Sequence, residues 1–120
     1  SMLRRSLLAA IPATLALPAL GRAQERVVNL YSSRHHDTDR ALYDGFTQQT
    51  GLRVRLIEAN ADQLLERIRA EGANSPADVL ITVDAGRLAR AQEAGVLAPA
   101  RSTVLDSRIP AALRDPEGHW

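Results

Sequence analysis

Cysteine and lysine are both absent from this sequence of 120 residues. Without cysteine the chain cannot form a disulfide, a thiolate metal site, a thiol nucleophile or a lipid-modified cysteine. All 15 basic residues are arginine, which indicates a GC-rich genome more than a mechanism. No glycine-rich phosphate loop is present, and Ser32 and Ser33 lack the Gly-x-Ser-x-Gly context of a serine nucleophile. These absences argue against several enzyme classes at once.

The chain also lacks a large excess of either basic or acidic residues, since its formal net charge is only +1. Nothing in this balance points to a nucleic-acid partner. Three of the 15 arginines lie in the first 23 residues, which hold no acidic residue, so 12 arginines face 14 acidic residues in the remainder. The remainder therefore carries a formal charge of −2 and is predicted to be a mildly acidic domain.

Residues 1–23 are typical of a secretory signal peptide. Arg4 and Arg5 precede an apolar run rich in alanine and leucine, and small residues flank Arg22 where a signal peptidase would cleave. The alternative is an N-terminal anchor helix, but the run is shorter than the roughly 20 residues of a membrane span. The leader predicts export to the periplasm by the Sec or the twin-arginine route. Residues 24–120 would form the mature domain.

The mature sequence alternates between β-rich segments and amphipathic helical segments. Leu42 and Phe46 lie four apart on one face of the first helical segment, and an Asn60–Gln63 capping box opens the second. Strands are predicted at 27–31, 53–58 and 79–81, helices from Asp37 or Thr38 to Thr50, from 61 to 71 and from Asp84 to Gly95, one helical turn over 109–113 and a turn over 114–118. This βαβαβα order predicts an α/β fold with a parallel sheet flanked by helices.

The carboxyl ends of the strands form the edge where open parallel sheets bind ligands. Three loops are predicted there: 32–37, 59–61 and 82–86. His35 and His36 lie in the first loop, and imidazole is a good ligand for zinc, copper, nickel and iron. The alternative is that both are donors in a polar loop.

Two imidazoles do not make a metal site, because at least one more ligand is needed. Asp37, Glu58 and Asp84 are the candidates, although Asp84 is also a natural helix cap. Arg87 is either paired with a carboxylate or holds an anion.

The mature chain resembles a known family in two stretches. These are "NLYSSRHHDTDRALYDGFTQQTGLRVRLIEANADQLLERIRAEGANSPADVLITVDAGRLARAQEAGVLAP" and "LRDPEGHW". Both are similar to the N-terminal part of the periplasmic ferric-iron-binding proteins of ABC transporters, from about Val27 to Trp120. The resemblance implies part of the N-terminal lobe of a two-lobe solute-binding fold over 24–120. It also implies a missing C-terminal part of the same receptor, a permease partner in the inner membrane, and a monomer at full length.

The same resemblance implies the site. In the branch whose first loop reads serine-arginine-histidine-tyrosine, that histidine and tyrosine bind Fe³⁺ with three later tyrosines. His35 matches the histidine, and His36 stands where the tyrosine would be. Arg34, Asp37, Asp84 and Arg87 would then support the site or hold an anion.

Three functions follow from these observations. The first is a ferric-iron receptor without enzymatic activity, in which three outcomes stay open for His36: weaker Fe³⁺ binding, a preference shifted towards Fe²⁺ or another divalent metal, or no contact with the metal. The second is a metalloenzyme, which lacks a clear third ligand and an acid/base pair. The third is a receptor of the same fold for an organic anion, held by helix N-termini with Arg34 or Arg87.

Overall fold

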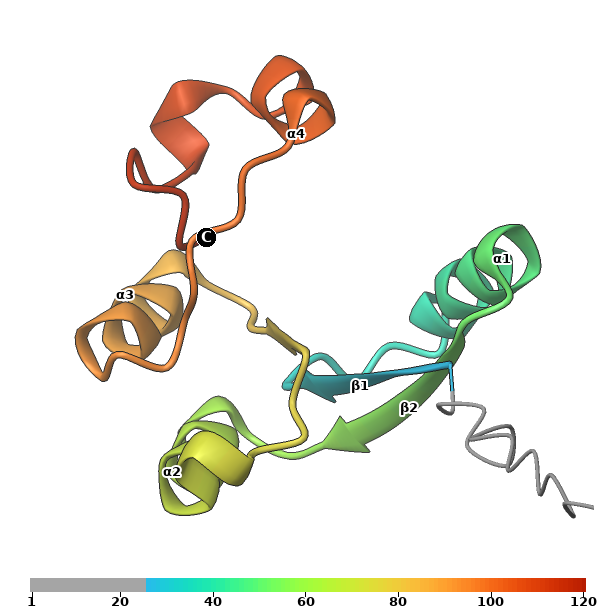
Figure 1. Ribbon diagram of the computed structural model, residues 1–120, viewed down its shortest axis with the longest axis horizontal. Coiled ribbons are helices and arrows are strands. Elements are labelled where there is room, and N and C mark those ends of the chain that lie inside the picture. Colours follow the sequence, from blue (N-terminus) through green and yellow to red (C-terminus); the bar gives the residue numbers. More distant parts are fainter. Residues whose placement is uncertain (1–25) are drawn as a thin grey trace, which may run out of the picture.

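The computed structural model describes residues 26–120 (Figure 1). The leader predicted over residues 1–23 lies outside the described residues and stays a prediction. The elements follow one another as β1 (Val27–Ser32), α1 (Asp39–Thr50), β2 (Arg53–Glu58), α2 (Ala61–Glu71), η2 (Gly72–Asn74), β3 (Val79–Ile81), α3 (Ala85–Glu93), α4 (Thr103–Arg108) and η3 (Ala111–Leu113). Among the helices of residues 26–120, none has both the length and the apolar character needed to cross a bilayer.

The three strands form a parallel sheet in the order β2-β1-β3, as the sequence pattern predicts. In the register, Val27 lies opposite Arg53 and Ser32 opposite Glu58, while Ser32 also lies opposite Ile81 on the other side. The connection from β1 to β2 through α1 and the connection from β2 to β3 through α2 run across the sheet in opposite directions. Right-handed connections therefore place α1 and α2 on opposite faces. Figure 1 shows α1 on one side of the strands and α2 with α3 on the other.

The core lies around the central strand, because only β1 has a strand on each side. Leu30 and Tyr31 of β1 are 4% and 0% exposed. The α2 helix packs against β1 and α3 packs against α2, and Leu64 of α2 and Ala91 of α3 are each 1% exposed. The core therefore continues from the central strand into these two helices.

Two of the predicted helix starts are confirmed in detail. The Asn60 side chain accepts a hydrogen bond from the Gln63 backbone N–H at 2.8 Å, and the Gln63 side-chain oxygen accepts one from the Asn60 backbone N–H at 3.4 Å. The Asp84 carboxylate accepts from the Arg87 N–H at 2.8 Å and caps α3. Each cap satisfies a backbone donor that a helix start otherwise leaves unpaired.

The start of α1 differs from the prediction. Thr38 occupies the cap position, but its backbone is already helical and its side chain makes no capping hydrogen bond. Backbone groups make the entry instead, as the Asp39 and Arg40 N–H groups donate to the carbonyls of His36 and Asp37. The apolar face of α1 also stays largely open, with Leu42 69% and Phe46 38% exposed.

The chain after α3 is more ordered than predicted. The helix α4 was missed, although Ser102 caps it by accepting from the Leu105 N–H. Where a helical turn was predicted over 109–113, the structure has the short 3₁₀ helix η3 over Ala111–Leu113. The turn predicted over 114–118 is present, since the Gly118 N–H donates to the Asp115 carbonyl at 3.0 Å.

Candidate functional site

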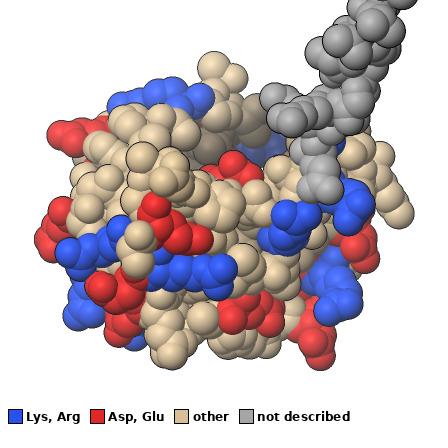
Figure 2. All heavy atoms as spheres, turned by 60° about the horizontal axis from the view of Figure 1, so that its bottom comes forward, with Lys and Arg blue, Asp and Glu red and all other residues tan. Residues whose placement is uncertain are grey.

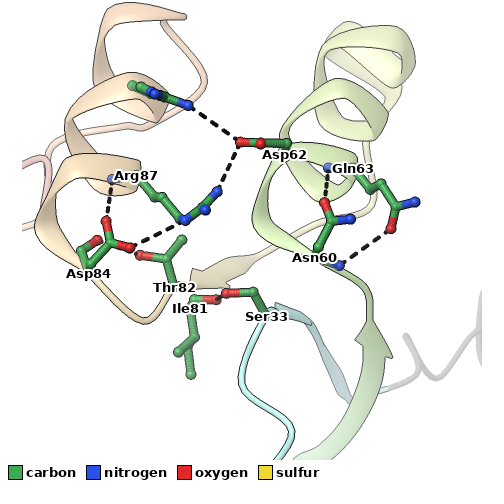
Figure 3. A network of polar contacts seen from close by, with 9 residues as sticks. Ser33, Asn60, Asp62, Gln63, Ile81, Thr82, Asp84 and Arg87 are labelled. Atoms are coloured by element: carbon green, nitrogen blue, oxygen red, sulfur yellow. Dashed lines mark hydrogen bonds and ion pairs between the residues drawn. The ribbon is translucent and has the colours of Figure 1, made fainter.

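The loops after the three strands meet at one edge of the sheet. The Ser33 N–H and hydroxyl both donate to the Ile81 carbonyl, at 2.9 and 3.3 Å, which joins the first loop to the end of β3 (Figure 3). On the other side, the Ala59 N–H donates to the Ser32 carbonyl at 3.4 Å. The histidine loop therefore lies between the ends of β2 and β3, as expected of a binding edge.

An ion pair between Arg34 and Asp39 holds the histidine loop against the start of α1. Arg34 donates from Nε and Nη2 to the two carboxylate oxygens of Asp39, at 2.9 and 3.1 Å. These hydrogen bonds are the main reason why the pKa of Asp39 is lowered and that of Arg34 is raised. Arg34 precedes His35 and His36 in the sequence and Asp39 follows them, so this ion pair closes the loop that carries the two histidines.

A pocket of about 510 Å³ opens beside this loop, between α1 and β2. Its walls include three of the predicted site residues, His35, His36 and Asp37. The other residues that line it are Arg40, Tyr43, Asp44, Thr47, Val54, Leu56 and Glu58. The lining combines imidazole, carboxylate and phenol groups, which are all potential metal ligands.

The His35 side chain of the loop lies near the Glu58 carboxylate at the end of β2 in this pocket. His35 Nδ1 lies 3.8 Å from Glu58 Oε2, and the two side chains are 58% and 44% exposed. Glu58 was one of three acidic residues that the sequence offered as a third ligand. The β1–β2 register brings it to the site by placing it opposite Ser32.

Asp84 and Arg87 do not line this pocket. Arg87 at the start of α3 donates from Nε to Asp84 at 3.2 Å and from Nη1 to Asp62 of α2 at 3.0 Å (Figure 3). Arg90 lies 3.7 Å from the same Asp62 oxygen. The predicted pairing of Arg87 with a carboxylate is confirmed, and the network links α2 to α3.

Tyr31, which lies close to the loop in the sequence, is fully occupied in the core. Its hydroxyl lies 3.0 Å from both carboxylate oxygens of Glu71, and the guanidinium of Arg67 lies 5.5 Å from its ring centroid. Burial, followed by the Glu71 carboxylate, raises the pKa of Tyr31. Tyr43, by contrast, lines the histidine pocket, which its place on a helix did not reveal.

One other cluster of potential ligands stands out in residues 26–120. Ligand atoms of Asp115, Glu117 and His119 lie within 4.8 Å of one another, and no such group of three around His35 is found in the described chain. Hydrogen bonds explain this cluster: Asp115 Oδ2 accepts from the His119 N–H at 3.0 Å and lies 2.8 Å from its Nδ1. These bonds lower the pKa of Asp115 and close the C-terminal turn.

The surface outside the pocket carries both signs of charge. Figure 2 shows acidic and basic side chains interspersed over the face that it presents. The Asp62, Asp84, Arg87 and Arg90 network follows the same rule, since both signs occur within one cluster. The charges there are engaged in local pairs that connect helices.

The fold and the loop can now be compared with known proteins. The family model of bacterial extracellular solute-binding proteins matches residues 28–117. The chain belongs to this family. It is 56% identical over 97 residues to iron uptake protein A1 of Synechocystis sp., covering 81% of this chain and 27% of that protein. To iron uptake protein A2 of the same organism it is 57% identical over 104 residues, covering 87% and 29%.

Solved structures of the family agree with the architecture. A Trichodesmium protein, IdiA or FutA, solved in complex with iron and citrate, superimposes with a TM-score of 0.77 at 66% identity. The match covers 78% of this chain and 30% of that one. The predicted parallel sheet flanked by helices is confirmed, and so is the resemblance to ferric-iron-binding proteins. The chain spans less than a third of the length of these relatives.

Proposed function

We propose that this chain is the N-terminal part of an exported receptor that captures ferric iron and delivers it to the permease of an ABC importer. The support is the 66% identity to a protein that was solved with iron and citrate. The pocket beside His35 gives the proposal a location, since it lies at the strand ends where this class of sheet binds ligands.

Iron would be bound here as cargo, so the site needs ligands rather than acid/base groups. A neutral imidazole of His35 supplies one nitrogen donor. Fe³⁺ is a hard cation and favours anionic oxygen, whereas imidazole also suits softer divalent metals. Because residues 26–120 hold no ready group of three ligands at His35, the remaining donors must come from the rest of the receptor.

A second candidate is a receptor of the same fold for a divalent metal. It is favoured by one observation, namely that two neighbouring imidazoles line the pocket where a ferric site would benefit from a phenolate. The organic-anion alternative has weaker support. The charges of its two candidate arginines are engaged with acidic partners, Arg34 with Asp39 and Arg87 with Asp84 and Asp62.

Catalysis is not part of the proposal. The named relatives are uptake and binding proteins, and the described pocket offers no paired acid and base at hydrogen-bond distance from each other. The predicted leader supports a periplasmic receptor, and so does the 27% identity over 106 residues to the Fe(3+)-binding periplasmic protein of Serratia marcescens. We further propose that the full-length receptor is a monomer and that residues 24–120 form part of its N-terminal lobe.

The decisive experiment replaces His35 by alanine in the full-length receptor. We expect His35→Ala to lower Fe³⁺ affinity about a hundredfold or more, because loss of a partner outside the ligand shell alone typically costs about 10–100-fold. Titration against a competing chelator at fixed pH measures the change. His119→Gln is the matched control, since His119 lies in the C-terminal turn and should leave affinity unchanged. Wild-type affinity in His35→Ala would reduce the histidine pair to a polar loop.

A further inference from the structure

The parallel register fixes Glu58 next to the histidine loop. Ser32 and Glu58 are the last residues of β1 and β2 and lie opposite each other. The Ala59 N–H extends the pairing by donating to the Ser32 carbonyl at 3.4 Å. The backbone of Glu58 is therefore held by the sheet, while the loop that carries His35 is held by the Arg34–Asp39 pair. Two independent restraints thus place these two residues next to each other.

The contact between them involves a particular ring nitrogen. His35 Nδ1 faces Glu58 Oε2 at 3.8 Å, and both residues line the same pocket. A hydrogen bond needs an N···O distance of about 2.7–3.2 Å, so a closure of about 1 Å would form one. Both side chains are around half exposed, which leaves them free to rotate by this amount.

We propose that Glu58 is a positioning residue that accepts the Nδ1–H of His35 and leaves Nε2 as the metal-binding atom. The inference rests on the proposed metal-binding function of His35. Histidine ligands commonly donate their second ring N–H to a carboxylate, which fixes the tautomer and raises the basicity of the metal-binding nitrogen.

Other carboxylates are less suited to this role. Asp39 is held by the two hydrogen bonds from Arg34, and Asp84 by its bonds to Arg87. Asp37 lines the pocket but is separated from His35 by a single residue on a loop that turns there. Glu58 approaches from a neighbouring strand, so the strand register sets the position of its backbone relative to the loop.

The tautomer of His35 tests the proposal without metal. The apo full-length receptor is labelled with ¹⁵N-histidine, and long-range ¹H–¹⁵N spectra are recorded at alkaline pH, where imidazole is neutral. The wild type should show mainly the Nδ1–H form. Glu58→Ala should shift His35 towards the Nε2–H form, which free imidazole side chains prefer, and Glu58→Asp should partly restore the Nδ1–H form. Glu66→Ala, an exposed glutamate paired with Arg69, is the control.

Iron affinity of the same variants completes the test. Glu58→Ala should lower Fe³⁺ affinity about tenfold, the lower end of the effect of losing an outer carboxylate, with partial rescue in Glu58→Asp. An unchanged tautomer in Glu58→Ala overturns the positioning role, whatever the affinity. A shifted tautomer with unchanged affinity overturns its relevance to binding. If His35→Ala loses affinity while Glu58→Ala does not, only the Glu58 inference fails. If both variants bind like the wild type, His35 is not a ligand and the Glu58 inference falls with it, whereas the proposed function fails only if the wild-type receptor itself does not bind Fe³⁺.

Discussion

His36 is the residue at which this chain departs from the branch that it resembles. The side chain is exposed at the pocket, so a larger ring fits there without repacking a core. We predict that His36→Tyr in the full-length receptor raises Fe³⁺ affinity about tenfold, which corresponds to about 1.4 kcal/mol. The reason is that a phenolate supplies the anionic oxygen that Fe³⁺ favours. Chelator competition measures the affinity, and a visible phenolate-to-iron band would show the new bond.

His36→Phe is the matched control, because it adds a ring of similar size without the oxygen. Its affinity should not rise above that of the wild type. If His36→Tyr and His36→Phe behave alike, residue 36 does not reach the metal, and the ring at this position only shapes the pocket.

At the level of single residues, the sequence predicted the position of the histidine loop better than it predicted which carboxylate lies beside that loop. His35, His36 and Asp37 could be placed at the pocket because they follow a recognisable strand. The third ligand stayed open among Asp37, Glu58 and Asp84, since the choice depends on strand register, which six-residue strands do not reveal. Asp84 could serve either as a cap or as a ligand, and the structure shows it capping α3.

Among the elements, α3 offers a direct test of the cap. We predict that Asp84→Ala lowers the free energy of unfolding by about 1 kcal/mol, because the Arg87 N–H loses its acceptor at the helix start. Asp84→Asn keeps a capping oxygen and loses only an exposed ion pair, so it should stay close to the wild type. Urea unfolding of the full-length receptor compares the two. Equal losses in both variants would assign the effect to the charge and not to the cap.

The Arg34–Asp39 pair makes the loop before α1 sensitive to acid. Arg34 depresses the pKa of Asp39, so the pair stabilises the folded state above the unfolded-state pKa of about 3.9. This contribution is lost as pH falls through the lower folded-state value. We predict that Arg34→Gln and Asp39→Asn are each less stable than the wild type near neutral pH. The differences in stability from the wild type should shrink as the pH falls below the unfolded-state pKa of Asp39 and through its lower folded-state pKa.

A double-mutant cycle between Arg34→Gln and Asp39→Asn isolates the pair. The coupling free energy from urea unfolding should be favourable at about pH 7 and should fall towards zero as the pH drops through the lowered folded-state pKa of Asp39, below which both folded and unfolded states bind the proton. A coupling that is constant over this range would mean that the two side chains do not interact as an ion pair in solution.

Element prediction succeeded where polar caps precede a long apolar stripe. The starts of α2 and α3 were predicted from Asn60 and Asp84 for this reason. The helix α4 has only six residues, too few for a period to emerge, although Ser102 supplies a cap. The side chain of Asp37 or Thr38 was expected to cap α1 from residue type alone, whereas backbone hydrogen bonds to the carbonyls of His36 and Asp37 make that entry.

At the scale of the whole molecule, the described part exposes more apolar surface than its pattern predicts. Leu42, Val83 and Leu113 are 69%, 61% and 69% exposed. The α2 helix packs against β1 and α3 against α2, whereas α1 has no buried residue. Since the chain spans less than a third of its relatives, sequence periodicity can indicate an apolar face without showing what covers it.

The ligand inventory leads to a prediction for the 120-residue chain in isolation. It holds two tyrosines, and the hydroxyl of Tyr31 is buried against Glu71. Tyr43 is the phenol that lines the pocket, and its neighbours do not include a ready group of three ligands. We therefore expect weak Fe³⁺ binding and no strong visible phenolate-to-iron band when the purified chain is mixed with ferric citrate. The full-length receptor is the positive control. If a strong band does appear, Tyr43→Phe decides its origin: loss of the band would make Tyr43 a ligand, and the pocket would then be a more complete iron site than its geometry indicates.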